Sequence, residues 1–135
     1  TKVAYRLLEP ELITNKKIVV VGGGDSAIES ALLLADQNRV TLSYRGDAFG
    51  RLKVGNSKNI KEAIANQKVD VRFNTNLKSI EEDKVWITDS ISGETKELEN
   101  DLVYIFAGGE LPTQFLEKVG IKITRKFGEA ILKHN

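Results

Sequence analysis

The apolar and polar positions in the first half of the chain alternate between short apolar runs and helical periodicity. This pattern predicts strands at 17–21, 39–44 and 69–73 and helices at 25–37 and 57–67. Strands and helices that alternate in this order form a parallel sheet with right-handed crossovers. The first half of the chain is therefore expected to be a βαβαβ unit.

Each predicted helix has one apolar face, and Ser57 is expected to cap the N-terminus of the second helix. The residues expected to face inward are Ile28, Ala31, Leu32 and Ala35 in the first helix and Ile60, Ala63 and Ile64 in the second. The segment 46–56, between the second strand and the second helix, contains three glycines and is expected to be a loop.

The second half of the chain has a different pattern. Short alternating segments at 77–82, 84–89 and 95–99 are separated by gaps that fit hairpins and are too short for helical crossovers. A last core strand is expected at 101–106 and a short helix at 112–119. The predicted fold class is α/β, with a Rossmann-like parallel sheet, helices on both faces and an inserted three-stranded antiparallel meander.

One domain is expected at 17–123, because a chain of 135 residues is long enough to bury one core. Residues 1–16 contain Glu9-Pro10-Glu11, which interrupts regular structure, and are expected to be a lead-in or linker. Residues 124–135 are expected to be a C-terminal tail. The chain contains no methionine, so we expect either a removed initiator or a segment of a longer protein.

The composition narrows the classes of function. The 20 basic and 19 acidic residues show no basic excess of the kind that binds nucleic acid. No apolar run approaches the ~18 residues of a membrane span, and we expect a cytoplasmic protein. Without cysteine there is no disulfide or thiolate nucleophile. The single histidine, His134, is not expected to be catalytic, and no metal site is expected.

The first strand leads directly into Gly22, Gly23 and Gly24, and the first helix begins immediately after them. In this strand–turn–helix context the match to GxGxxA, which ends at Ala27, predicts a dinucleotide-binding turn. Gly22 would allow a sharp turn, and Gly24 a close approach of the pyrophosphate. Ala27 would let the helix pack closely on the strand. Free N–H groups of the first helical turn would then bind the pyrophosphate.

Three segments in this order resemble the NAD(P)H-binding domain of thioredoxin reductase-like flavoproteins, in the pyridine nucleotide–disulfide oxidoreductase superfamily. They are Val-Val-Val-Gly-Gly-Gly-Asp-Ser-Ala-Ile-Glu at 19–29, Tyr-Arg-Gly-Asp-Ala-Phe at 44–49 and Ala-Gly-Gly-Glu-Leu-Pro-Thr at 107–113. The resemblance covers 17–123 and includes the meander. It implies that this chain binds NAD(P)H, and that FAD is bound by a flanking domain that is absent here, not by this chain. Thioredoxin reductases carry a Cys pair before the nucleotide-binding strand, so this cysteine-free chain is more similar to the Cys-lacking branch.

The end of the second strand bears on the choice between NADP(H) and NAD(H). NAD enzymes usually place a carboxylate there, whereas this strand ends in Tyr44 and Arg45, with Asp47 beyond it. Arg45 could bind a 2′-phosphate through two N–H groups, with Tyr44 beside the adenosine and Arg51 as a second phosphate ligand. Gly46 stands where the family has a second arginine, which makes the phosphate clamp thinner. We expect NADP(H) rather than NAD(H). Asp47 could instead be a ribose ligand, as in an NAD enzyme, or could simply cap the loop.

The other candidate cofactor-binding residues are Asp25, Ser26 and Glu29 in the first helix and Ala107, Gly108 and Gly109 after the last strand. Asp25 is expected to cap the helix or to meet a ribose, because its charge would repel the pyrophosphate. Glu29 matches a family position near the nicotinamide, although it could simply complement the helix dipole. Ser26 could donate to a phosphate or only pack, and the two late glycines could form only a tight turn.

The leading hypothesis is a domain that presents NADPH for hydride transfer to FAD in the full-length flavoprotein and is inactive alone. A non-catalytic NAD(P) redox-sensing module is the main alternative, and FAD binding at the glycine turn is another, against which Arg45 argues. The expected partners are a dinucleotide, the flavin domain and an electron acceptor that the sequence does not identify. A homodimer is one option for the oligomeric state.

Overall fold

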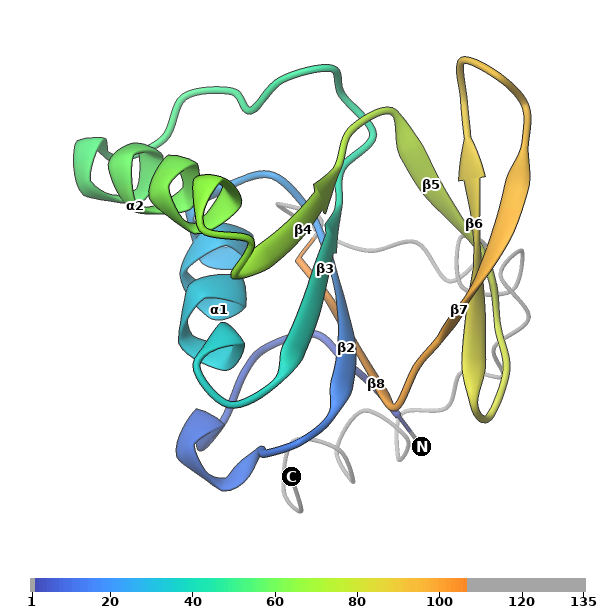
Figure 1. Ribbon diagram of the computed structural model, residues 1–135, viewed down its shortest axis with the longest axis horizontal. Helices are drawn as coiled ribbons and strands as arrows, with labels where there is room; N and C mark the ends of the chain where they lie inside the picture. The colour runs from blue at the N-terminus through green and yellow to red at the C-terminus, as the bar shows by residue number, and fades with distance from the viewer. Residues whose placement is uncertain (1, 107–135) are drawn as a thin grey trace.

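The computed structural model describes residues 2–106. Its main sheet contains five parallel strands in the order β1-β8-β2-β3-β4 (Figure 1). The strands are β1 (Val3–Ala4), β2 (Lys17–Val21), β3 (Arg39–Ser43), β4 (Val69–Arg72) and β8 (Leu102–Ile105). The expectations for Ala107, Gly108, Gly109, the helix at 112–119 and the tail lie outside the described residues.

The strand order reverses between β2 and β8. After β2 the chain builds outward to β3 and β4, and later it returns to place β8 on the other side of β2. β1, at the edge beyond β8, was not predicted: Val3 and Ala4 of the lead-in pair with Val103 and Tyr104. Because all five strands are parallel, their carboxyl ends meet at one edge of the sheet. Ligands of open α/β sheets bind at such a reversal point.

Two α-helices, α1 (Asp25–Ala35) and α2 (Val54–Ala65), lie on the same face of the sheet (Figure 1). A short 3₁₀ helix, η1 (Pro10–Leu12), precedes β2 and contacts α1. The predicted alternation of strands and helices is confirmed. The prediction of helices on both faces of the sheet is not met within residues 2–106, because both α-helices lie on one face and the antiparallel sheet lies on the other side. The α1 helix is two residues shorter at its end than the apolar pattern predicts.

The predicted start and packing of α2 are wrong in two respects. Ser57 does not cap the helix: it lies inside α2, and its N–H donates to the Lys53 carbonyl at 2.9 Å. Ile60 and Ala63 are buried, but Ile64 is 40% exposed. Since α2 contacts β4 at the end of the sheet and α1 beside it, only a narrow stripe of α2 is covered.

A separate antiparallel sheet, formed by β5 (Thr75–Ile80), β6 (Lys84–Asp89) and β7 (Thr95–Glu99), confirms the predicted meander. Figure 1 shows it on the opposite side of the main sheet from the two helices. A buried hydrogen bond of 2.7 Å between the hydroxyls of Ser43 and Thr75 joins the end of β3 to the start of β5. Trp86 is half-buried on β6, with the Lys84 ammonium 5.3 Å from its ring centre.

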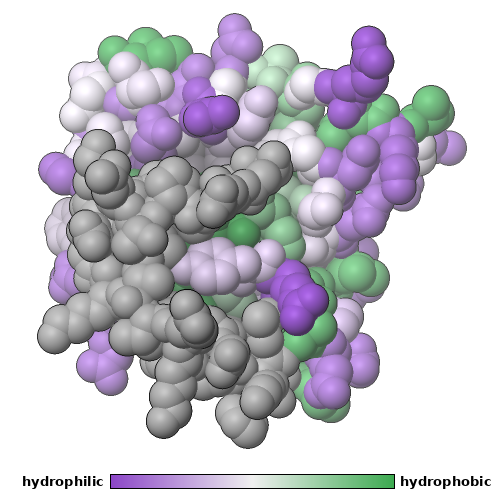
Figure 2. Space-filling view, turned by 180° about the vertical axis from the view of Figure 1, so that it is seen from behind, coloured by the Kyte–Doolittle hydropathy of each residue, from purple (hydrophilic) through white to green (hydrophobic). Residues whose placement is uncertain are grey.

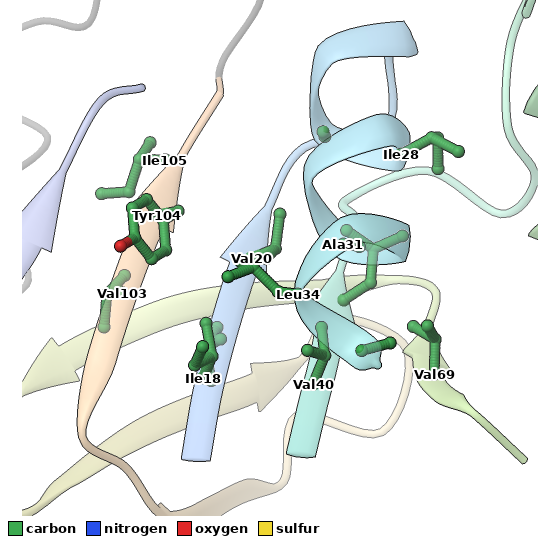
Figure 3. Packing of buried hydrophobic residues seen from close by; sticks show 14 of the residues in the cluster. Ile18, Val20, Ile28, Ala31, Leu34, Val40, Val69, Val103, Tyr104 and Ile105 are labelled. Carbon is green, nitrogen blue, oxygen red and sulfur yellow. The ribbon is translucent and has the colours of Figure 1, made fainter. Parts of the chain in front are cut away.

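The main core lies between α1 and the central strands. Ala31 and Leu34 are fully buried and face Val20 and Val40 across this layer (Figure 3). Ile18 on β2 belongs to the same buried cluster. Fully burying an aliphatic side chain of this size contributes roughly 1.5–3 kcal/mol, so this layer holds the strand ends and the start of α1 in a fixed relation.

The described surface is mainly polar. Figure 2 shows hydrophilic side chains over most of the described part of one face, with hydrophobic ones in separate small groups. The exposed large apolar side chains are Leu12, Leu33, Val54, Ile64 and Ile91. Neither described α-helix is long and apolar enough to cross a membrane.

Candidate functional site

The glycine turn lies at the carboxyl end of β2, next to the point where the strand order reverses. Its first residue, Gly22, has a φ of 138°, which side-chain-bearing residues rarely adopt. A Cβ there would stand 2.3 Å from the Phe106 carbonyl oxygen, beyond the end of β8. The Phe106 N–H donates to the Val21 carbonyl at 2.8 Å, so the ends of β2 and β8 are joined at the turn. The sharp turn predicted for Gly22 is confirmed.

The start of α1 is open at Gly24, which is exposed. Gly24 occupies the N-cap position, and a Cβ built on it would meet nothing within 4 Å in the described part of the chain apart from its neighbours in sequence. No side chain of the described residues caps α1, so the first N–H groups of the helix have no such partner. Ala27 is fully buried, and its Cβ would lie 3.1 Å from a Cβ built on Gly22. This agrees with the role predicted for Ala27, which is to let the helix pack closely on the strand. The turn thus offers an open surface of backbone donors, which suits an anion.

The aromatic ring of Tyr44 lies between two glycines. A Cβ on Gly23 would stand 2.5 Å from one edge of the ring, and a Cβ on Gly46 would stand 2.7 Å from the other. Phe49 stacks on Tyr44 with ring centres 5.9 Å apart, and Phe73 contacts Phe49 edge-on at 4.9 Å. The absence of side chains at both glycines therefore creates the slot for Tyr44, which holds the end of β3 against the glycine turn.

The predicted phosphate ligands lie in the loop that follows β3. Arg45 and Arg51 are both exposed, and neither forms an ion pair with any residue between 2 and 106. The nearby Arg72 differs, because its guanidinium pairs with Asp70 at 3.0 Å. Asp47 is exposed in the same loop. The loop thus presents two arginines without a carboxylate partner in the described part of the chain.

Asp25 does not cap α1. Its Oδ1 accepts hydrogen bonds from the Lys53 N–H at 2.9 Å and from the Asn56 side-chain amide at 2.8 Å. The same Asn56 nitrogen donates to Glu29 Oε2 at 2.7 Å, and the Lys53 ammonium lies 3.8 Å from that oxygen. The hydrogen bond from Asn56, followed by that from Lys53, holds the pKa of Asp25 below its usual value. Asp25 therefore stays ionised and bonded to the start of α2; contact with a ribose stays a prediction.

Sequence reasoning missed Asn56 and Lys53, which bind the two carboxylates of α1. The spacing of Asp25 and Glu29 places them on one helix face, so a polar partner could have been anticipated. Nothing in the local pattern identified that partner, because it lies 31 residues from Asp25 and 27 from Glu29. Ser26 is exposed in the first turn of α1, and its proposed contact with a phosphate stays a prediction.

The opposite edge of the sheet holds an open groove of about 810 Å³ between the amino ends of β2 and β3. Lys16, Asn38 and Gln67 are among its lining residues, and none of the predicted cofactor ligands lies in it. Within residues 2–106, no three His, Cys, Asp or Glu side chains gather closely enough to hold a metal ion. The predicted ligands that are described gather at the carboxyl edge, around the turn and the β3–α2 loop.

Comparison with known proteins agrees with this geometry. A family model for pyridine nucleotide-disulphide oxidoreductases matches residues 2–130. The chain belongs to this family. The match confirms the resemblance carried by the sequence motifs.

Individual family members match at moderate identity. Thioredoxin reductase of Bacillus subtilis (strain 168) is 33% identical over 112 residues, covering 78% of this chain and 34% of that protein. Ferredoxin–NADP reductase of Lactobacillus gasseri is 31% identical over 124 residues, covering 88% and 38%. The structure of bacillithiol disulfide reductase Bdr (YpdA) from Bacillus cereus has a TM-score of 0.77 at 28% identity, covering 93% and 39%. The chain thus spans less than two fifths of the length of these relatives.

Proposed function

We propose that this chain is the NAD(P)H-binding domain of an FAD-dependent oxidoreductase, and that it presents NADPH for hydride transfer to FAD in the full-length protein. The observation that carries the proposal is the open backbone surface at Gly24 and the start of α1, at the reversal of strand order. The similarity to a ferredoxin–NADP reductase supports a nicotinamide dinucleotide as the ligand.

The pyrophosphate would lie against the first turn of α1. Free backbone N–H groups at a helix N-terminus, together with the helix dipole, favour a bound anion. Space beside Gly24 would admit the phosphates, since apart from its chain neighbours nothing in residues 2–106 lies within 4 Å of a Cβ built there. The Asp25 carboxylate would oppose this anion if it were free, but it is bonded to Asn56 and Lys53 at the start of α2.

The β3–α2 loop supports NADPH rather than NADH as the nucleotide. Arg45 and Arg51 are exposed and have no carboxylate partner among residues 2–106. A guanidinium binds a phosphate through paired N–H groups, and such charge-assisted bonds are about twice as strong as neutral ones. Arg45 stands just beyond β3, where the adenosine ribose lies in dinucleotide-binding folds. It is therefore the leading ligand for the 2′-phosphate.

The chemistry itself would belong to the cofactors: NADPH would give a hydride to FAD, which would leave NADP⁺ and FADH⁻. The residues of this chain would bind and orient the dinucleotide. FAD would be held by a flanking domain, and the electron acceptor would lie outside this chain. Alone, the chain is expected to bind NADPH and to oxidise none of it, which nucleotide absorbance would measure.

The first test is a fluorescence titration of the chain with NADPH and NADH side by side. We expect tighter binding of NADPH, and a loss of about tenfold or more in NADPH affinity for Arg45→Ala, since hydrogen bonds to charged groups are worth about 1.5–3 kcal/mol. Arg39→Ala is the matched control, because Arg39 is an exposed arginine at the other end of β3. Equal binding of the two nucleotides by the unaltered chain would contradict the NADPH assignment.

The second test separates binding from folding. In Gly24→Ala the added methyl meets no protein atom, so stability should change by less than about 1 kcal/mol. The methyl would occupy space needed by the pyrophosphate, and affinity for both nucleotides should fall by about tenfold or more, a loss of at least ~1.4 kcal/mol. Gly55→Ala, at another glycine with open surroundings, should leave binding unchanged. Unchanged binding by Gly24→Ala would rule out this turn as the pyrophosphate site.

A further inference from the structure

The loop between β3 and α2 is attached at both of its ends to the β2–α1 region. At its beginning, the Tyr44 ring fills the slot between Gly23 and Gly46. At its end, the Lys53 N–H donates to Asp25 at 2.9 Å. The intervening residues, 45–52, include Arg45 and Arg51, neither of which forms an ion pair within residues 2–106.

Asn56 adds two side-chain hydrogen bonds to the attachment at the end of the loop. Its side-chain amide has two N–H donors, and the structure uses the nitrogen for two carboxylates, Asp25 at 2.8 Å and Glu29 at 2.7 Å. These carboxylates lie four residues apart on one face of α1, where they would otherwise repel each other. An amide between two carboxylates satisfies both without adding charge. A carboxylate in its place would put three negative charges together.

We propose that Asn56 is a positioning residue that determines the preference for NADPH over NADH, because it holds the arginine-bearing loop beside the glycine turn. The proposal rests on the proposed function of the chain. Asn56 acts through Asp25 and Glu29, which hold the start of α2 and the end of the preceding loop. The 2′-phosphate would then meet Arg45 and Arg51 in a fixed position.

Release of this attachment should affect one nucleotide more than the other. The pyrophosphate and nicotinamide are common to NADPH and NADH, and the turn that would bind the pyrophosphate is held by the buried Ala27 and the join between β2 and β8. The turn that would bind the pyrophosphate is therefore held without Asn56. Of the two nucleotides only NADPH carries the 2′-phosphate that the loop would bind, so displacement of the loop should reduce NADPH affinity more than NADH affinity.

The test is Asn56→Asp, with Asn59→Asp as the matched control. Asn59 is exposed one turn further along α2, and the described structure shows no side-chain hydrogen bond for it, so its substitution adds the same charge without touching the carboxylates. We expect about tenfold weaker NADPH binding for Asn56→Asp, which corresponds to ~1.4 kcal/mol, and less than about twofold change for NADH. Asn56→Ala should show the same selectivity with a smaller loss, and Asn59→Asp should show neither.

Several outcomes would overturn the proposal. Equal losses for both nucleotides would mean that Asn56 supports only the fold, as would unfolding of both Asn56 variants in a circular-dichroism melt. An unchanged NADPH-to-NADH ratio would show that the loop stays in position without the amide. If the unaltered chain binds NADPH preferentially and only the Asn56 result fails, the proposed function stands. If the unaltered chain binds neither nucleotide, both proposals fail.

Discussion

The glycine turn and the β3–α2 loop meet at the same edge of the sheet, but they are held in different ways. The turn is fixed by backbone: a positive φ at Gly22, a hydrogen bond between Phe106 and Val21, and the buried Ala27 beneath it. The loop is fixed by side chains at its two ends, Tyr44 and Asn56. The backbone feature proposed to bind both dinucleotides and the side-chain feature proposed to distinguish them thus lie next to each other.

The comparison suggests how such a site can change its preference. Pyrophosphate binding through N–H groups needs an open helix start and little else, so it constrains few side chains. Selection of a 2′-phosphate needs charged groups at the correct distance, and the proposed groups are the exposed Arg45 and Arg51 of the β3–α2 loop. The three changes below test this division, beginning with the largest expected effect.

If the backbone holds the glycine turn, a substitution in the turn should destabilise the whole fold. Gly22→Ala places a Cβ 2.3 Å from the Phe106 carbonyl oxygen at a φ of 138°, so the ends of β2 and β8 must separate or strain. We expect a loss of about 2–3 kcal/mol in the free energy of unfolding, measured by urea denaturation, and loss of binding of both nucleotides. Gly50→Ala, which meets nothing within 4 Å, is the control. Equal stability of the two variants would contradict the statement that the backbone at Gly22 holds the turn.

Changes in the loop should be milder and should depend on Tyr44. The family pattern has an arginine at position 46, yet Gly46→Arg should weaken NADPH binding, because its Cβ would stand 2.7 Å from the Tyr44 ring. The backbone of Gly23 lies on the other side of the ring, so we expect the loop to shift, at a cost of about 1 kcal/mol, or roughly fivefold in affinity. Adding Tyr44→Ser should relieve the crowding and let the new arginine strengthen NADPH binding. Tighter binding by the single variant would show that the ring moves freely.

The smallest effect is expected at Asp25, and it should depend on pH. Hydrogen bonds from Asn56 and Lys53 lower the pKa of Asp25 in the folded chain, so its ionised form is stabilised by folding. That contribution is fully present above the ordinary value of 3.8 and is lost as the pH falls through the lower folded-state value. Asp25→Asn should therefore melt slightly below the unaltered chain at pH 7, with the gap closing in acid.

A double-mutant comparison checks the cause of that gap. If Asn56 is the main partner, Asp25→Asn should have a smaller effect on melting temperature in an Asn56→Ala background than in the unaltered chain. Melting curves at pH 7 and in acid for the four proteins would measure this. A gap that persists in acid, or that is the same in both backgrounds, would assign the stabilisation to another contact.

Much of the fold could be predicted because periodicity reports which faces are buried. Two features identify β2 and α1 without any tertiary information: the apolar run 18–21 and the spacing of Ile28, Ala31 and Ala35. The meander followed from gaps too short for a crossover. The pairing of Val3 and Ala4 with β8 could not be predicted, because a two-residue strand has no period.

Sequence alone determined the glycine turn, the order of strands and helices, and the two arginines that follow β3. Tertiary structure decided what those residues contact: Tyr44 enters a slot between two glycines, Asp25 bonds to Asn56, and α2 begins at Val54 instead of Ser57. The physical reason is the distance along the sequence over which each signal acts. Hydrophobic periodicity and turn chemistry act over a few residues, whereas Asp25 and Asn56 are brought together only when α1 and α2 pack side by side.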